Sequence, residues 1–178
     1  MSMKKRILLA LLAVAPAFAD VVVDGGWYGF CYQGSNTPIT ADCQNAGVGV
    51  TGNPVTFTLT TPGVFRITDA FFAGDTFDVY SNGHLILQTS VVAAQPAPGI
   101  TDPDLAFANP AYSRGSVALG PGSYQLQVFV RDSPFDSGAG YLSVISSAAA
   151  VPEPAAVSGL MAAAALAIGI GRRQRQRQ

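Results

Sequence analysis

Apolar and polar residues alternate along three stretches of the chain. In 55–60 three apolar side chains alternate with three threonines, and 65–68 and 124–131 repeat the pattern. A period of two places successive side chains on opposite faces of a β-strand, so that one face is buried and the other is in water. The pattern therefore predicts half-buried strands at these positions.

Turn residues divide the chain into further short β-rich segments. Asn82-Gly83 separates 76–81 from 84–89, and an Asn-Gly pair between such segments is a strong hairpin signal. The other predicted strands are 21–23, 27–30, 115–119 and 139–146, and the predicted loops are 33–53, 95–111 and 132–138. We identify no helical period between 20 and 150. The expected fold is an all-β, antiparallel β-sandwich with a jelly-roll-like arrangement of strands.

The N-terminal segment 1–19 has the parts of a secretory signal peptide. Three basic residues precede the apolar run 7–15, and Ala17 and Ala19 form an A-x-A cleavage site. We expect Asp20 to be the first residue of the mature protein. The alternative is a retained N-terminal anchor, but the apolar run is shorter than the roughly 20 residues that a spanning helix needs.

Segment 151–178 differs in composition from the residues before it. It begins with two prolines around one glutamate, continues with a predicted transmembrane helix at 156–171, and ends in a basic tail at 172–178. The prolines impose an extended backbone and lack N–H groups, so this motif fits neither a helix nor a paired strand. The motif residues are Val151, Pro152, Glu153, Pro154 and Ala155, and the tail arginines are Arg172, Arg173, Arg175 and Arg177.

This order of motif, apolar helix and arginine-rich end resembles the PEP-CTERM sorting signal of Gram-negative bacteria. The resemblance implies that the helix holds the protein in the inner membrane and that the tail arginines stop transfer. It also implies that exosortase, a membrane protease-transpeptidase, recognises Pro152-Glu153-Pro154 and releases domain 20–150 to the cell surface or exopolysaccharide matrix. The alternative is a proline-rich hinge before an ordinary membrane anchor.

Three internal stretches, 67–83, 102–116 and 120–123, are similar to segments of secreted bacterial PEP-CTERM β-proteins. That group has no assigned activity. The similarity therefore supports the expected fold and implies nothing about chemistry.

The charge of the chain is divided unevenly between its ends and its middle. The net charge is −1, but between 20 and 154 three arginines stand against all eleven carboxylates, a net charge of −8. Such an acidic domain is repelled by nucleic acid and by anionic membrane surfaces, so neither is an expected partner. The basic ends fit the positive-inside rule: both ends stay in the cytoplasm while the acidic middle crosses the inner membrane.

The two cysteines, Cys31 and Cys43, lie twelve positions apart in a Gly-, Asn-, Thr- and Pro-rich segment. Because export would bring them into an oxidising compartment, we expect a disulfide, with two free thiols as the alternative. A zinc site is not expected, because cysteine pairs bind zinc together with partners and His84 is the only histidine.

No catalytic pattern stands out, so we expect a non-enzymatic protein. His84 follows a hairpin turn, and the sequence has no Gly-x-Ser-x-Gly motif for a nucleophilic serine. A secreted hydrolase is an alternative function, since glycoside hydrolysis needs only a pair of carboxylates. The sequence offers many pairs among Asp75, Asp78, Asp102, Asp104, Asp132 and Asp136.

Two kinds of binding site remain open at this point. The loops carrying Asp102, Asp104, Asp132 and Asp136 are weak candidates for a structural calcium ion, with solvated turn aspartates as the alternative; no other cofactor is expected. A carbohydrate-binding module of the matrix is the other hypothesis, because sugar rings stack on exposed aromatics. Its candidates are Trp27 and Phe129, the latter on the outward phase of its strand, although a sandwich core also uses aromatic residues.

Overall fold

The computed structural model describes residues 21–43 and 48–147. The predicted signal peptide, 1–19, and the predicted sorting segment, 151–178, lie outside the described residues. The first compact unit ends at Ser146 and contains every strand of the described residues. Within the described part, no helix is long and apolar enough to cross a membrane.

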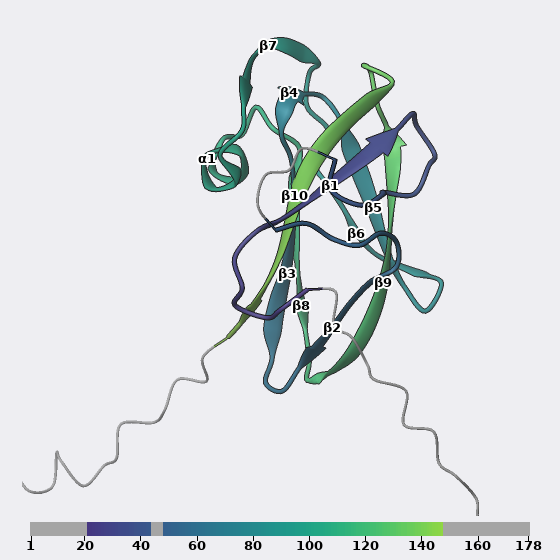
Figure 1. Ribbon diagram of the computed structural model, residues 1–178, viewed down its shortest axis with the longest axis vertical. Helices are drawn as coiled ribbons and strands as arrows, with labels where there is room; N and C mark the ends of the chain where they lie inside the picture. The colour runs from purple at the N-terminus through teal and green to yellow at the C-terminus, as the bar shows by residue number, and fades with distance from the viewer. Residues whose placement is uncertain (1–20, 44–47, 148–178) are drawn as a thin grey trace, which may run out of the picture. The chain divides into compact units, whose positions relative to one another are not determined.

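Two four-stranded antiparallel sheets and a small two-stranded one form the described part of this unit (Figure 1). The first sheet has the order β1 (Tyr28–Gln33), β10 (Ser137–Ser146), β3 (Gly63–Asp69) and β8 (Arg114–Leu119). The second has the order β2 (Val55–Leu59), β9 (Gly122–Asp132), β5 (Thr76–Ser81) and β6 (His84–Gln88). The prediction of an all-β antiparallel fold is therefore confirmed.

Aromatic residues from the two sheets interlock in the core. The rings of Phe30 on β1 and Phe77 on β5 meet edge to face with centroids 5.3 Å apart. The rings of Phe57 on β2 and Phe65 on β3 stack at 6.4 Å. All four are at most 2% exposed, so the inner faces of both sheets bury one another as in a β-sandwich.

Strands predicted from alternation are confirmed at their buried positions. Val55, Phe57 and Leu59 are buried on β2 while the threonines between them are not. The Asn82-Gly83 turn joins β5 to β6, and both residues have positive φ, 51° and 77°. Positive φ at both central positions is what the type I′ hairpin turn requires.

The prediction of a structureless loop at 95–111 is wrong. The segment contains the short strand β7 (Gln95–Ile100), which pairs with β4 (Phe71–Ala73), and the helix α1 (Pro103–Ala108). Asp102 caps the helix, because its carboxylate accepts from the backbone N–H groups of Asp104 and Leu105. In Figure 1, α1, β4 and β7 lie together beside one end of the sheets. Helix α1 depends on its cap and β7 on its pairing with β4, and neither feature produces a periodic pattern of apolar residues in the sequence.

Two strand boundaries near the N-terminus also differ from expectation. Segment 21–23 is not a strand: Val21 is buried and donates its N–H to Thr56 O, and a turn at Asp24, with φ 62°, follows. Strand β1 begins at Tyr28 and continues to Gln33, through part of the expected loop. Its pairing with β10 and with residues 40 and 49 explains the extension.

Candidate functional site

A trough of about 400 Å³ lies on the outer face of the second sheet. Strand β5 contributes Asp78 and Tyr80, and β9 contributes outward-facing Gln127, Phe129 and Arg131. The register brings these side chains together, because Asp78 pairs with Phe129 and Tyr80 pairs with Gln127 across the two strands. Asn36 and Gly83 complete the rim. We call this set of residues the outer-face trough.

The polar side chains of the trough are held in place by one another. Arg131 Nη1 lies 3.1 Å from Asp78 Oδ1, and Arg131 Nη2 donates to the carbonyl of Thr89 at 2.9 Å. Gln88 Nε2 donates to the same Asp78 oxygen at 3.0 Å. The side chains of Arg131 and Asp78 are 26% and 14% exposed, so both reach water while their positions are fixed.

The aromatic side chains of the trough form a perpendicular pair. The centroids of Tyr80 and Phe129 are 5.9 Å apart and the ring planes cross at 87°. Both residues are half-buried. Sequence reasoning identified Phe129 from its outward phase, and the structure places it in the trough. It missed Tyr80, Asp78 and Arg131 as partners, because β5 and β9 are distant in the chain.

The rim residue Asn36 belongs to a segment that runs beside β9. Asn36 N donates to Val130 O at 2.7 Å, and Val130 N donates to Thr37 O at 2.8 Å. Segment 36–39 thus lies along the same edge of β9 as β2 does, further along the strand.

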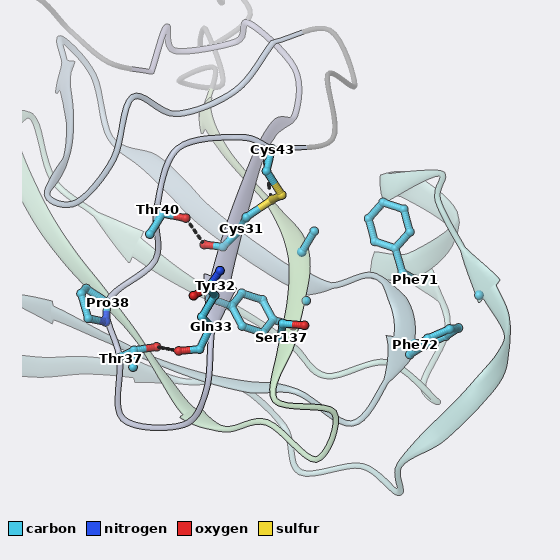
Figure 2. A pocket seen from close by; sticks show the side chains of 13 residues that line it. Cys31, Tyr32, Gln33, Thr37, Pro38, Thr40, Cys43, Phe71, Phe72 and Ser137 are labelled. Carbon is cyan, nitrogen blue, oxygen red and sulfur yellow. Dashed lines mark hydrogen bonds between the residues drawn. A yellow bond between two sulfur atoms is a disulfide. The ribbon is translucent and has the colours of Figure 1, made fainter.

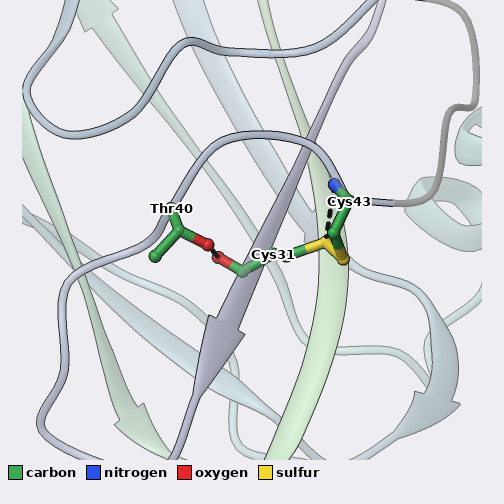
Figure 3. The surroundings of a disulfide bond; sticks show 3 residues. All are labelled: Cys31, Thr40 and Cys43. Atoms are coloured by element: carbon green, nitrogen blue, oxygen red, sulfur yellow. Dashed lines mark hydrogen bonds between the residues drawn. A yellow bond between two sulfur atoms is a disulfide. The ribbon is translucent and has the colours of Figure 1, made fainter.

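The predicted disulfide is confirmed. Cys31 and Cys43 are joined at an S–S distance of 2.00 Å, and the bond closes the segment that carries Asn36 onto β1 (Figure 3). Thr40 adds a hydroxyl bond to Cys31 O at 3.1 Å.

A larger pocket of about 820 Å³ opens beside the disulfide. Figure 2 shows Phe71 and Phe72 on one side and the disulfide-closed segment, with Tyr32 and Thr37, on the other. Phe72 is 45% exposed, and Phe71 has a φ of 61°, which is rare for an aromatic residue. Apolar rings and hydroxyl and amide side chains line the pocket, and none of its described lining residues is charged. It therefore lacks a fixed ion pair such as that of the trough.

Two buried carboxyl groups lie beneath the surface near this pocket. Asp69 is fully buried and accepts from the N–H groups of Ala70, Gly74 and Asp75 at 2.8, 2.9 and 3.1 Å. Burial, with the nearby Asp75 carboxylate, raises the pKa of Asp69 to about 8, although the three N–H groups oppose the rise. Burial also raises the pKa of Asp75. Sequence reasoning missed the Asp69 side chain, which shapes the turn from β3 into β4.

Around Asp75 the hydroxyls of Tyr32 and Ser133 oppose the effect of burial on its pKa. Within the described residues, however, neither Asp75 Oδ1 nor either hydroxyl has a partner at hydrogen-bonding geometry. All three residues are at most 6% exposed, so this polar group lies in the interior.

Trp27, the other predicted glycan residue, lies outside the trough. Its indole Nε1 donates to Asp104 Oδ1 at 2.8 Å, and its ring packs against Phe107 of α1 with centroids 5.5 Å apart. The guanidinium of Arg66 lies over the same ring. Trp27 is half-buried, and its principal contacts attach α1 to the first sheet.

The four predicted calcium candidates fall in two separate places. Asp102 caps α1 and Asp104 holds the Trp27 indole. Asp132, the last residue of β9, and Asp136, in the turn that follows, are both exposed, and Asp132 Oδ1 lies 3.4 Å from the Ser35 hydroxyl. Across the described ranges, 21–43 and 48–147, no three His, Cys, Asp or Glu side chains form a group that could hold a metal ion.

A scan against protein-family models found no match, and a search of curated proteins also found none.

Proposed function

We propose that this chain is an exported, non-enzymatic protein of the cell surface or exopolysaccharide matrix, sorted by exosortase. The observation that carries the proposal is the order of Pro152-Glu153-Pro154, the apolar run 156–171 and the basic tail 172–178. The signal peptide 1–19 and a transient anchor in the inner membrane belong to the same proposal. The last described strand, β10, ends at Ser146, so the motif follows the described strands in the sequence.

The physical steps of this proposal follow from length and charge. At about 1.5 Å per residue, a helix over the apolar run reaches roughly 22–25 Å, which is short for a stable span. A short span suits a segment that is passed on to a processing enzyme. The tail arginines remain on the cytoplasmic side. The acidic middle of the chain, with a net charge of −8 from three arginines and eleven carboxylates, makes nucleic acid an unsuitable partner.

The jelly-roll description of the sandwich is also part of the proposal. Leaving aside the short β4 and β7, eight strands divide into two four-stranded sheets, with consecutive strands often in opposite sheets. Such alternation is expected of the two Greek keys of a jelly roll. It supports a rigid exported body.

We include a non-enzymatic role because three of the six aspartates that could form a catalytic pair have structural partners. Asp78 pairs with Arg131, Asp102 caps α1, and Asp104 holds Trp27. His84 is exposed at the start of β6. A secreted hydrolase remains the alternative, and hydrolysis of a polysaccharide by the purified protein would overturn this element.

Processing is tested by expressing the full chain, with a C-terminal epitope tag, in a host that has exosortase. We expect the wild-type protein to lose the tag and leave the inner membrane, with a mature N-terminus at Asp20 by intact mass. Pro152→Ala with Pro154→Ala should keep the tag and stay in the membrane fraction. The matched control changes two exposed prolines of the body, Pro121 and Pro134, to alanine and should be processed normally. Normal processing of the motif variant would refute the sorting proposal.

A second candidate function is carbohydrate binding within the matrix. The observation that favours it is the outer-face trough, where two aromatic rings stand beside a fixed carboxylate and guanidinium. Binding pockets for small ligands combine apolar walls with a few placed polar groups in this way. Binding and sorting are compatible, because the trough and the sorting motif are different parts of the chain.

A further inference from the structure

We infer that the outer-face trough binds a neutral, hydroxyl-rich stretch of a polysaccharide. This inference rests on the second candidate function, carbohydrate binding, and adds the site and the class of sugar. The trough has a volume of about 400 Å³, within the roughly 300–1,000 Å³ range of small-ligand sites. It therefore has room for a short part of a glycan chain.

The aromatic pair supplies the apolar side of recognition. A sugar ring has an apolar face of C–H groups, and such a face packs on the face of an aromatic ring. Tyr80 and Phe129 cross at 87°, so the two rings present differently oriented surfaces on the same sheet. The Tyr80 hydroxyl is also a donor and acceptor. Neither ring belongs to the buried core, so their contact with each other leaves surface for a ligand.

The charged pair supplies the polar side. Asp78 Oδ1 is occupied by Arg131 and Gln88, while Asp78 Oδ2 and Arg131 Nε have no protein partner among the described residues. A free carboxylate oxygen accepts from a sugar hydroxyl, and a free N–H donates to one. Since their neighbours already fix both side chains, binding costs little further ordering of these groups.

Charge selects a neutral ligand over an anionic one. Among the described residues that line the trough, Arg131 is the one cation, and its charge is balanced by Asp78 at 3.1 Å. Arg66 is committed to Trp27 and to the Ser143 hydroxyl, and Arg114 lies on β8 of the other sheet. The described part of the chain therefore leaves no arginine to neutralise a uronate or sulfate in the trough. The surrounding negative charge also repels anionic polysaccharides at a distance.

The test measures binding of the full chain, solubilised in a polyoxyethylene detergent that contains no sugar. The neutral probes are laminarin, dextran and galactomannan, and the anionic probe is polygalacturonate, all by isothermal titration calorimetry. We expect wild-type protein to bind at least one neutral probe and to bind polygalacturonate at least about tenfold more weakly. Failure with all three neutral probes, or equal binding of polygalacturonate, would overturn the inference.

Variants locate the binding site. Phe129→Ala and Tyr80→Ala should each weaken binding about tenfold or more. Gln127→Ala changes an exposed side chain of the trough, so it tests the site even if the aromatic variants unfold, and it should also weaken binding. The matched control is Phe72→Ala, an exposed aromatic residue in the disulfide pocket, which should bind as wild type does. Unchanged binding in folded Phe129→Ala and Gln127→Ala would refute the trough as the site.

The outcomes for binding and sorting are distinguishable. Loss of binding in a protein that is still exported and processed rejects this inference and leaves the sorting proposal in place. If the wild-type protein binds a neutral glycan but the motif variant is still processed normally, the sorting proposal is rejected and this inference stands.

Discussion

The guanidinium carbon of Arg66 lies 4.5 Å from the centroid of the Trp27 ring. The same group lies 5.4 Å from the ring of Phe107, so one cation from β3 contacts an aromatic residue before β1 and another on α1. Together with the bond from Trp27 to Asp104, this contact attaches the six-residue helix to the first sheet. A helix this short depends on such tertiary contacts for its stability.

Removing the Trp27 ring should therefore destabilise the protein. We expect Trp27→Ala to lower the free energy of unfolding by about 2–3 kcal/mol, less than for a fully buried tryptophan because Trp27 is half-buried. Urea denaturation measures this. Glycan binding should be unchanged, because Trp27 lies outside the trough. Trp27→Phe is the control: it keeps an aromatic ring but loses the bond to Asp104. Loss of binding in a folded Trp27→Ala protein would contradict this prediction and show that Trp27 contributes to glycan binding.

The disulfide should stabilise both the fold and the rim of the trough. Opening the Cys31–Cys43 bridge frees a short loop, so Cys31→Ser with Cys43→Ser should lower the free energy of unfolding by about 3 kcal/mol. Because the closed segment carries Asn36, glycan binding should weaken as well. Reducing agent should bring wild type to the denaturation midpoint of the double variant and leave that variant unchanged. Equal stability of the two proteins under oxidising conditions would contradict the prediction.

Strand assignment from the sequence succeeded where one residue pattern determines the structure. The alternation in 55–60 identifies the buried positions of β2, and Asn82-Gly83 identifies the turn between β5 and β6. Helix α1 was missed, although Asp102 followed by Pro103 is a recognised helix start, because six residues are too few to show a period. Local signals of this kind are decisive only when tertiary contacts support them.

The trough was only partly predictable for a different reason. The outward phase of Phe129 is visible in the sequence, but its neighbours Asp78 and Tyr80 come from a strand about fifty positions earlier. Their proximity depends on β5 pairing with β9 rather than with another strand. The sequence suggests that both strands exist, and it does not specify which strands are adjacent. Candidate sites built across strands therefore need the sheet order.

The stability of the protein should decrease from acidic to mildly basic pH. The pKa of Asp69 is about 8 in the folded protein, against an ordinary value of 3.8. Between these values the folded state retains a proton that the unfolded chain has released, so rising pH favours unfolding. Above about pH 8 this effect levels off. The raised pKa of Asp75 acts in the same direction.

Thermal unfolding of the full chain between pH 5 and pH 9 tests this expectation. The midpoint should fall as the pH rises and then flatten. Asp69→Asn removes the ionisable group and should reduce the slope, although it also alters the acceptors for Ala70, Gly74 and Asp75 and should lower the midpoint overall. A wild-type midpoint that is constant or rises from pH 5 to pH 8 would show that the three N–H bonds keep Asp69 ionised.

The balance of charge in the trough gives a prediction about specificity. Asp78→Asn removes the carboxylate that balances Arg131, 3.1 Å away, so the trough becomes positive. We expect this variant to gain binding of polygalacturonate, and the gain should decrease as salt is raised because the new attraction is screened. Its effect on stability should be about 1 kcal/mol or less, since the pair is partly exposed. Calorimetry at low and high salt measures the gain.

The matched control removes the same charge next to the trough. Asp132 adjoins Arg131 in the chain but is exposed and does not line the trough, so Asp132→Asn changes the net charge of the protein by the same amount. If an anionic sugar binds only when no carboxylate balances the charge of Arg131, then only Asp78→Asn gains affinity for polygalacturonate. Equal gains in both variants would mean that overall charge, and not the Asp78–Arg131 pair, sets the preference for neutral glycans.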